Sequence, residues 1–181
     1  MKKLLFFLPV AILLFSVSSC KKIVEQFFSP IDVNMPSFQL VIPPVPVVSP
    51  SEVSLGSYTV YFNLDSAIKA NTRGVFGVST ISTIKVRQMN LEVLNADQQN
   101  NLANFETAGI SLASNSNTSQ ANVAAFTFAD VYAISASSQI DGAELKNYFA
   151  GNELSFTLTG KNRRPTQKAL TILVKTTLSV K

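Results

Sequence analysis

Apolar and polar residues alternate along much of the chain and predict short β-strands. In the segment 58–64, YTVYFNL, every second residue is apolar, which places one row of side chains toward a core. Further short strands are expected at 109–113 and 123–128, on either side of the polar loop 114–120. The pattern therefore predicts a chain built mainly from half-buried strands.

The segment 83–94, TIKVRQMNLEVL, changes the parity of its alternation. Ile84 and Val86 fall in one phase, and the apolar positions resume at Met89 in the other. One extra residue in a strand produces such a shift without breaking the strand. A β-bulge is predicted near Arg87 and Gln88.

The last third of the chain predicts a short helix followed by two long strands. Asp141 is placed to cap the helix and Gly151 to end it. The strands, near 154–158 and 170–180, have the same phase and predict an antiparallel hairpin whose turn lies within 160–168. The whole pattern favours an all-β fold: an antiparallel two-layer β-sandwich, immunoglobulin-like in a loose sense, with one or two short helices.

Five prolines between Pro36 and Pro50 set the preceding segment apart. Each proline removes a backbone donor, which argues against a helix or a central strand. A stiff, partly extended tether is expected, with Phe38–Ile42 pairing at a sheet edge. A proline-rich ligand for a recognition domain is the alternative function for this segment.

The first residues have the layout of a secretory signal. Lys2 and Lys3 precede twelve uncharged residues, 4–15, with a proline in the middle. As a helix this run would rise roughly 18 Å, whereas the hydrocarbon core of a bilayer is about 30 Å thick. The segment is therefore too short for a stable transmembrane helix.

Val17, Ser18, Ser19 and Cys20 follow this run directly. Together, residues 1–22 resemble the signal peptide and lipobox of bacterial lipoproteins. The resemblance implies that Cys20 is diacylglycerylated, that the peptide before it is removed, and that acyl chains hold the protein on a lipid bilayer. Ordinary cleavage that leaves Cys20 as a free thiol is the alternative. Because Cys20 is the only cysteine, no intrachain disulfide can form.

The lipoprotein resemblance also suggests organisation and location. Together with the prolines and the strand pattern, it divides the chain into a signal peptide (1–19), a lipidated cysteine with its proline-rich tether (20–51) and a β-sandwich domain (52–181). In enterobacterial lipoproteins an aspartate after the cysteine favours the inner membrane; Lys21 stands there, which points to the outer membrane. No acidic run of the kind that marks some surface lipoproteins follows Cys20, so the periplasmic leaflet is favoured over the cell surface.

The formal charge of +4 includes Lys2 and Lys3; without them, 13 cations face 11 anions, too even a balance for a nucleic-acid binder. The charges are uneven, however, with seven cations and one anion after residue 145. Lys161, Arg163, Arg164 and Lys168 form a candidate contact for phosphate groups of lipid or lipopolysaccharide. The alternative is a solvated turn whose charges prevent edge-to-edge aggregation. Another envelope protein is a further candidate partner.

Histidine is absent, which excludes Ser/His/Asp and Cys/His catalysis and histidine metal sites. The S-x-x-K pattern of serine enzymes with a lysine base occurs at Ser66 and Lys69, but its usual K-T-G and S-D-N partners do not. A capped turn between strands is the alternative. Asp65, Ser66 and Ala67 also resemble the three-residue O-glycosylation site of exported proteins in Bacteroidota, so Ser66 is a candidate modified residue and this group a candidate origin.

These features predict a non-enzymatic envelope lipoprotein with a structural or binding β-sandwich, no metal and no cofactor. A surface adhesin or glycan-binding module is the first alternative. A small serine/lysine envelope hydrolase that uses Ser66 and Lys69 is the second.

Overall fold

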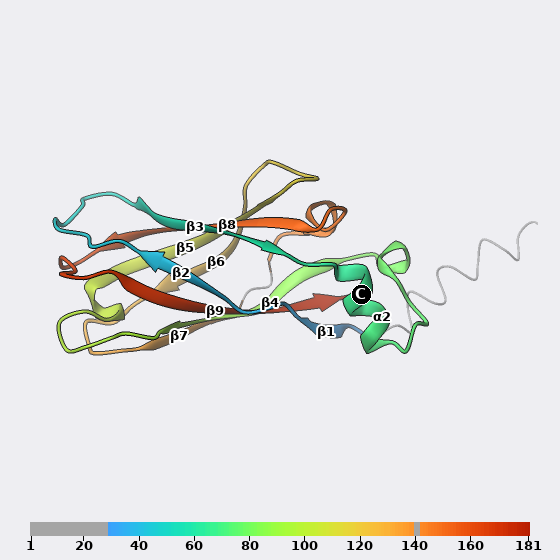
Figure 1. Cartoon of the computed structure of the whole chain (residues 1–181), viewed down its shortest axis with the longest axis horizontal. Helices are drawn as coiled ribbons and strands as arrows, with labels where there is room; N and C mark the ends of the chain where they lie inside the picture. Colours follow the sequence, from blue (N-terminus) through green and yellow to red (C-terminus); the bar gives the residue numbers. More distant parts are fainter. Residues whose placement is uncertain (1–28, 140–141) are drawn as a thin grey trace, which may run out of the picture.

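The alternating segments form nine strands in two antiparallel sheets, in a computed structural model that describes residues 29–139 and 142–181. Sheet A contains β1 (Ile31–Asn34), β2 (Phe38–Ile42), β4 (Ile84–Val93), β7 (Ser135–Gln139) and β9 (Leu170–Val180). Sheet B contains β3 (Val53–Tyr61), β5 (Phe105–Ser114), β6 (Ala121–Thr127) and β8 (Glu153–Asn162). The predicted all-β antiparallel sandwich is confirmed (Figure 1).

Helical structure in the described residues is short. The α-helix is α2 (Leu64–Asn71), and the 3-10 turns are η1 (Val78–Thr80), η2 (Leu102–Asn104) and η3 (Lys146–Tyr148). The helix predicted after Asp141 appears only as η3, and Asp141 itself lies outside the described residues.

The strand order is that of a jelly roll. Sheet A runs β2-β9-β4-β7, with β1 pairing the other half of β9, and sheet B runs β3-β8-β5-β6. An immunoglobulin domain groups its strands differently, so the loose likeness to that fold extends only to the two packed layers. Most successive strands therefore alternate between the sheets.

The predicted hairpin of the last two strands is wrong in its pairing. Both strands exist and point their apolar rows inward, but β8 pairs with β3 and β5, whereas β9 pairs with β1, β2 and β4. Residues 163–169 cross from one sheet to the other. The two strands face each other across the core, a relation that the phase of their side chains does not distinguish from pairing in one sheet.

The segment predicted as a tether contains two strands of the sandwich. Phe38–Ile42 pairs with β9, as predicted for an edge strand, but Ile31–Asn34 also pairs with β9. Residues 31–34 and 38–42 are therefore part of the sandwich, although both precede the predicted boundary at residue 52. The prolines permit this because they flank the strands: Pro36 lies between β1 and β2, and the other four follow β2.

The predicted bulge in β4 is confirmed. Register with β9 shifts between Val86 and Gln88, and the apolar residues on both sides of the shift are buried. The core lies between the two sheets. Its largest fully buried side chains include Phe105, Phe156 and Met89.

The two ends of the sandwich differ. The loop end comprises residues 43–52, 94–104, 128–134 and 163–169, which all join strands at one end. The helix end carries α2, and β1 begins there, because Ile31 lies opposite Val180 at the end of β9 (Figure 1). The eleven residues of β9 separate the ends by roughly 35 Å at about 3.3 Å per residue. Within the described ranges, no helix has the length and apolar character needed to cross a membrane.

Candidate functional site

Buried asparagines lock the loops of the loop end together. Asn104 donates from Nδ2 to the carbonyl oxygens of Gln99 (3.0 Å) and Pro165 (2.9 Å). Its main-chain carbonyl accepts from the backbone amides of Arg163 and Arg164. Asn100 Oδ1 accepts from the Gln167 backbone (2.8 Å). Loops 94–104 and 163–169 are therefore joined by several partly buried hydrogen bonds, which favour a fixed arrangement of this end.

The proline-rich segment is tied to the same loops. Thr166 and Val45 exchange two bonds: the Val45 amide donates to Thr166 Oγ1 (2.8 Å), and the Thr166 amide donates to the Val45 carbonyl (2.9 Å). Asn162, which is fully buried, accepts from the Ser49 amide (3.0 Å) and donates to the Val47 carbonyl (2.9 Å). Residues 43–52 are thus held against the sandwich by specific hydrogen bonds.

The four cations predicted to contact phosphate all have partners inside the protein. Lys161 pairs with Glu106 (2.7 Å) and Lys168 with Asp97 (2.6 Å). The guanidinium of Arg163 donates to two backbone carbonyls at 3.0 Å, and that of Arg164 binds the carboxylate of Asp130. A phosphate group would have to compete with these groups. The structure therefore supplies a structural role for each cation, and their role in anion contact stays a prediction.

Asp97 is the anion most strongly stabilised at this end. The Lys168 ammonium, and then the Asn100 side chain, hold its carboxyl pKa well below its usual range. Burial opposes them, and the backbone amides of Gln99 and Asn100 lower the pKa further. Because the Asp97 carboxylate accepts several hydrogen bonds from its own loop, it stabilises the conformation of that loop.

Exposed apolar side chains gather at the loop end. Six of the ten large apolar residues exposed in the described chain lie there: Val47, Val48, Leu94, Val131, Tyr132 and Ile134. Leu94 and Ile134 lie on neighbouring strand ends, because the Val93 amide donates to the Ile134 carbonyl (2.7 Å). Rigid loops that expose apolar groups are typical of contact surfaces. Sequence analysis missed this surface because these residues are far apart in the chain.

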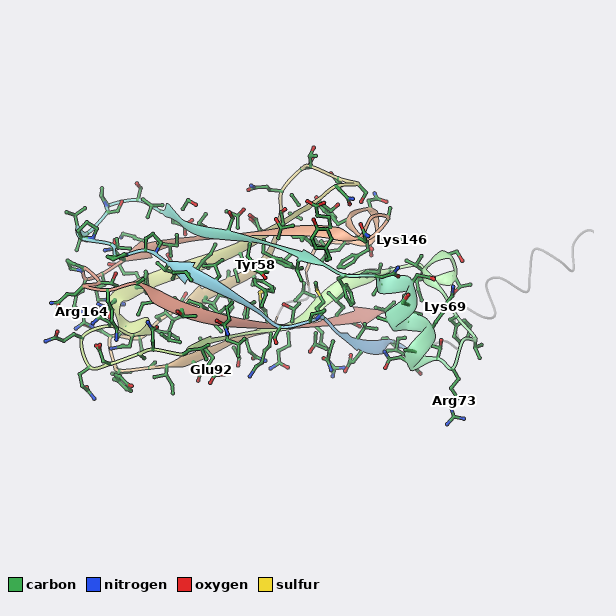
Figure 2. All side chains as sticks on the ribbon, in the orientation of Figure 1. Tyr58, Lys69, Arg73, Glu92, Lys146 and Arg164 are labelled. Carbon is green, nitrogen blue, oxygen red and sulfur yellow. The ribbon has the colours of Figure 1, made fainter. Side chains whose placement is uncertain are left out.

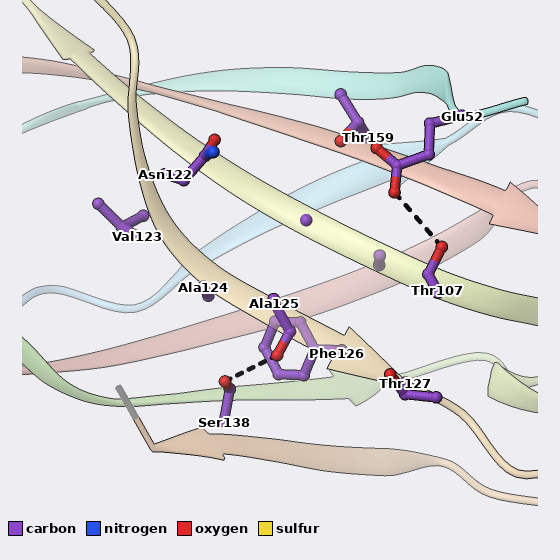
Figure 3. A pocket seen from close by; sticks show the side chains of 12 residues that line it. Glu52, Thr107, Asn122, Val123, Ala124, Ala125, Phe126, Thr127, Ser138 and Thr159 are labelled. Atoms are coloured by element: carbon purple, nitrogen blue, oxygen red, sulfur yellow. Dashed lines mark hydrogen bonds between the residues drawn. The ribbon is translucent and has the colours of Figure 1, made fainter. Parts of the chain in front are cut away.

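A shallow depression of about 530 Å³ lies along β5 and β6 (Figure 3). Two hydrogen bonds join residues of its lining: Thr107 donates to Glu52 (3.4 Å), and Ser138 of sheet A donates to the Ala125 carbonyl of sheet B (2.8 Å). Glu52 is the only acidic residue among the described residues that line it. The depression thus offers no second carboxylate for acid-base chemistry.

Ser66 lies at the start of α2, exposed to solvent. Its backbone amide donates to Asn63 Oδ1 (2.9 Å), which caps the helix. The Lys69 ammonium pairs with Asp65 (2.6 Å), and this bond, together with the Val78 amide, lowers the pKa of Asp65. The capped turn is therefore present. Exposure also meets the requirement for the predicted glycosylation of Ser66, which stays a prediction.

Cys20, with the whole lipobox, lies outside the described residues. Among residues 29–139 and 142–181, no three side chains of the metal-binding acidic, histidine or cysteine types lie close enough to hold a metal ion.

No protein-family model matches the chain, and no curated protein matches it. Solved structures with some likeness include "Crystal structure of decameric BFDV Capsid Protein" (TM-score 0.38, 11% identity, 84% of this chain and 97% of that chain). Others are the Drosophila NLP-core (TM-score 0.29, 8% identity, 79% and 98%) and a mutant of a family 29 carbohydrate-binding module complexed with cellulohexaose (TM-score 0.29, 11% identity, 83% and 80%). Likeness at this level assigns neither a family nor a function.

Proposed function

We propose that this protein is a lipid-anchored envelope protein, acylated at Cys20, whose sandwich is a non-catalytic module that contacts another envelope protein through its loop end. The lipobox resemblance supports the anchor. Only ten residues separate Cys20 from β1, so the sandwich is tethered at its helix end. The acyl chains insert in the periplasmic leaflet of the outer membrane, and the sandwich lies in the periplasm.

The observation that carries the binding role is the construction of the loop end. Its loops are joined by buried asparagines, each of its four cations has a partner inside the protein, and its exposed groups include Val131, Tyr132 and Ile134. Such a surface favours a protein partner over a phosphate group, because an exposed aromatic and aliphatic cluster gains from burial while no cation is left unpaired at the predicted contact.

The anchor is tested by the intact mass of the membrane-extracted protein. The expected mass is that of residues 20–181 plus acyl chains, whereas the Cys20→Ala variant keeps its signal peptide and gains no lipid. Ser19→Ala is the matched control, because a small residue is retained before the cysteine, and it should be processed like the wild type. An unmodified mature chain in the aqueous fraction would refute the anchor.

The contact surface is tested by photo-crosslinking in cells. A crosslinking amino acid at Tyr132 should give one discrete protein adduct of defined mass, which disappears when Val131 and Ile134 are both changed to serine. The same probe at Tyr61, which is also exposed but lies at the helix end, is the control. Equal adducts from both positions would contradict a role for the loop end.

A further inference from the structure

The turn after α2 differs from every other arginine-bearing segment of the described chain. Arg87, Arg163 and Arg164 each bind a carboxylate, whereas the exposed guanidinium of Arg73 makes no hydrogen bond or ion pair with any described residue. Figure 2 shows Arg73 projecting away from the body of the molecule at the helix end, opposite to Arg164. This is an uncompensated positive charge.

The backbone holds Arg73 in this position. Arg73 has φ of 53° and Gly74 has φ of 80°, so two successive residues occupy the left-handed region. The Gly74 amide donates to the Lys69 carbonyl (2.7 Å), and the Val75 amide donates to the Thr72 carbonyl (3.1 Å). The conformation of the protruding turn is therefore fixed by backbone hydrogen bonds.

An apolar side chain accompanies the charge. Val75 is 69% exposed, among the most exposed large apolar residues of the described chain, and stands two positions from Arg73. Nearby acids do not offset the charge. Asp65 is paired with Lys69, and Glu144 accepts from the backbone amides of Ile84 and Lys146 (2.9 Å each). A guanidinium beside an exposed valine suits the boundary between phosphate headgroups and acyl chains.

The position of the turn favours a lipid bilayer as its binding partner. It lies at the helix end, where β1 begins, and residues 21–30 can span at most about 35 Å between Cys20 and β1. The loop end, with the cations predicted to contact phosphate, lies a further strand length away. The linker therefore joins the sandwich at its helix end, which is the end nearer to the anchor along the chain.

We infer that the turn 73–75 docks on the bilayer that holds the anchor: Arg73 binds phosphate oxygens of anionic phospholipid headgroups, and Val75 enters the interface. This rests on the proposed lipid anchor. The acyl chains supply the affinity, and the turn sets the orientation that directs the loop end away from the membrane.

The test uses the full lipidated protein in phosphatidylcholine vesicles with and without phosphatidylglycerol. Because acylation consumes Cys20, Val75→Cys supplies a unique thiol for an environment-sensitive fluorophore. Its emission should shift to the blue and be quenched by headgroup-labelled lipid, more strongly with phosphatidylglycerol. Val131→Cys, 64% exposed at the loop end, is the matched control and should stay aqueous.

Arg73→Gln should lower the ratio of docked to undocked Val75 label about fivefold in the anionic vesicles. Lys175→Gln removes one charge that is already paired with Glu92 and should change nothing. If the protein floats with vesicles while the Val75 label stays as aqueous as the Val131 label, docking is refuted and the anchor stands. If the protein does not float, the proposed anchor itself fails.

Discussion

Asn162 and Val47 are joined by a partly buried hydrogen bond between the end of β8 and the proline-rich segment, with 2.9 Å from Nδ2 to the carbonyl oxygen. The same side chain accepts from the Ser49 amide, so one asparagine holds a segment more than a hundred residues away in sequence. This relationship makes residues 43–52 part of the domain.

Replacing Asn162 with alanine should therefore destabilise the domain. The change leaves the Ser49 amide and the Val47 carbonyl without their partner, and we expect a loss of about 2 kcal/mol in the free energy of unfolding. Urea denaturation measures the loss. Asn152→Ala, at an exposed asparagine, should change stability by less than about 0.5 kcal/mol. Equal stability of both variants would show that the proline-rich segment is not held.

Asp97 should contribute to the pH dependence of stability. Its pKa is lower in the folded protein than in the unfolded chain, so its contribution is present above the unfolded value of about 4 and is lost as pH falls toward the folded value. Asp97→Asn should reduce the drop in the urea midpoint between pH 7 and pH 3. Lys168→Gln, which removes the largest cause of the shift, should reproduce part of this effect. An unchanged drop in both variants would contradict the assignment.

Gly160 lies where another chain segment approaches closely. A Cβ there would meet Leu55 Cδ1 and the Thr107 carbonyl oxygen, each at 2.8 Å. Gly160→Ala should cost about 1–3 kcal/mol of stability, as measured by thermal unfolding. Gly109→Ala, whose nearest contact is the Thr159 hydroxyl at 3.3 Å, should cost clearly less, because that side chain can give way. The reverse order would count against the packing described between β3, β5 and β8.

Ser66 should be unreactive toward fluorophosphonate and penicillin probes, because the Lys69 ammonium is bound to Asp65. Ser66→Ala should leave stability nearly unchanged, whereas Asn63→Ala removes the helix cap and should cost about 1 kcal/mol in urea denaturation. Labelling of the wild type that is lost in Ser66→Ala would instead support the hydrolase alternative.

The periplasmic location can be tested with thiol chemistry. In cells that produce Val131→Cys, a membrane-impermeant maleimide should label the protein only after the outer membrane is permeabilised. With Cys20, its one cysteine, acylated as proposed, the wild-type protein should stay unlabelled in both cases. Labelling of intact Val131→Cys cells would place the domain on the cell surface, and labelling of the wild type would reveal a free Cys20.

Side-chain periodicity alone predicted the sandwich class and the faces of its strands. The parity change in 83–94 located the bulge of β4, and the alternation in β8 and β9 identified their buried rows. These features are local, because a strand turns alternate side chains to opposite faces whatever its neighbours are. The lipobox resemblance likewise depends only on the order of residue types in the first twenty-two residues, so it could be recognised without the fold.

Tertiary structure decided which strands pair and which charges remain available. β8 and β9 meet across the core and not in one sheet, since a period of two does not specify the neighbouring strand. Arg163 and Arg164 find partners in residues distant in sequence and share the carboxylate of Asp130, whereas Arg73 lacks a partner among the described residues. Pairing and charge compensation depend on contacts between remote segments, and only the fold brings those segments together.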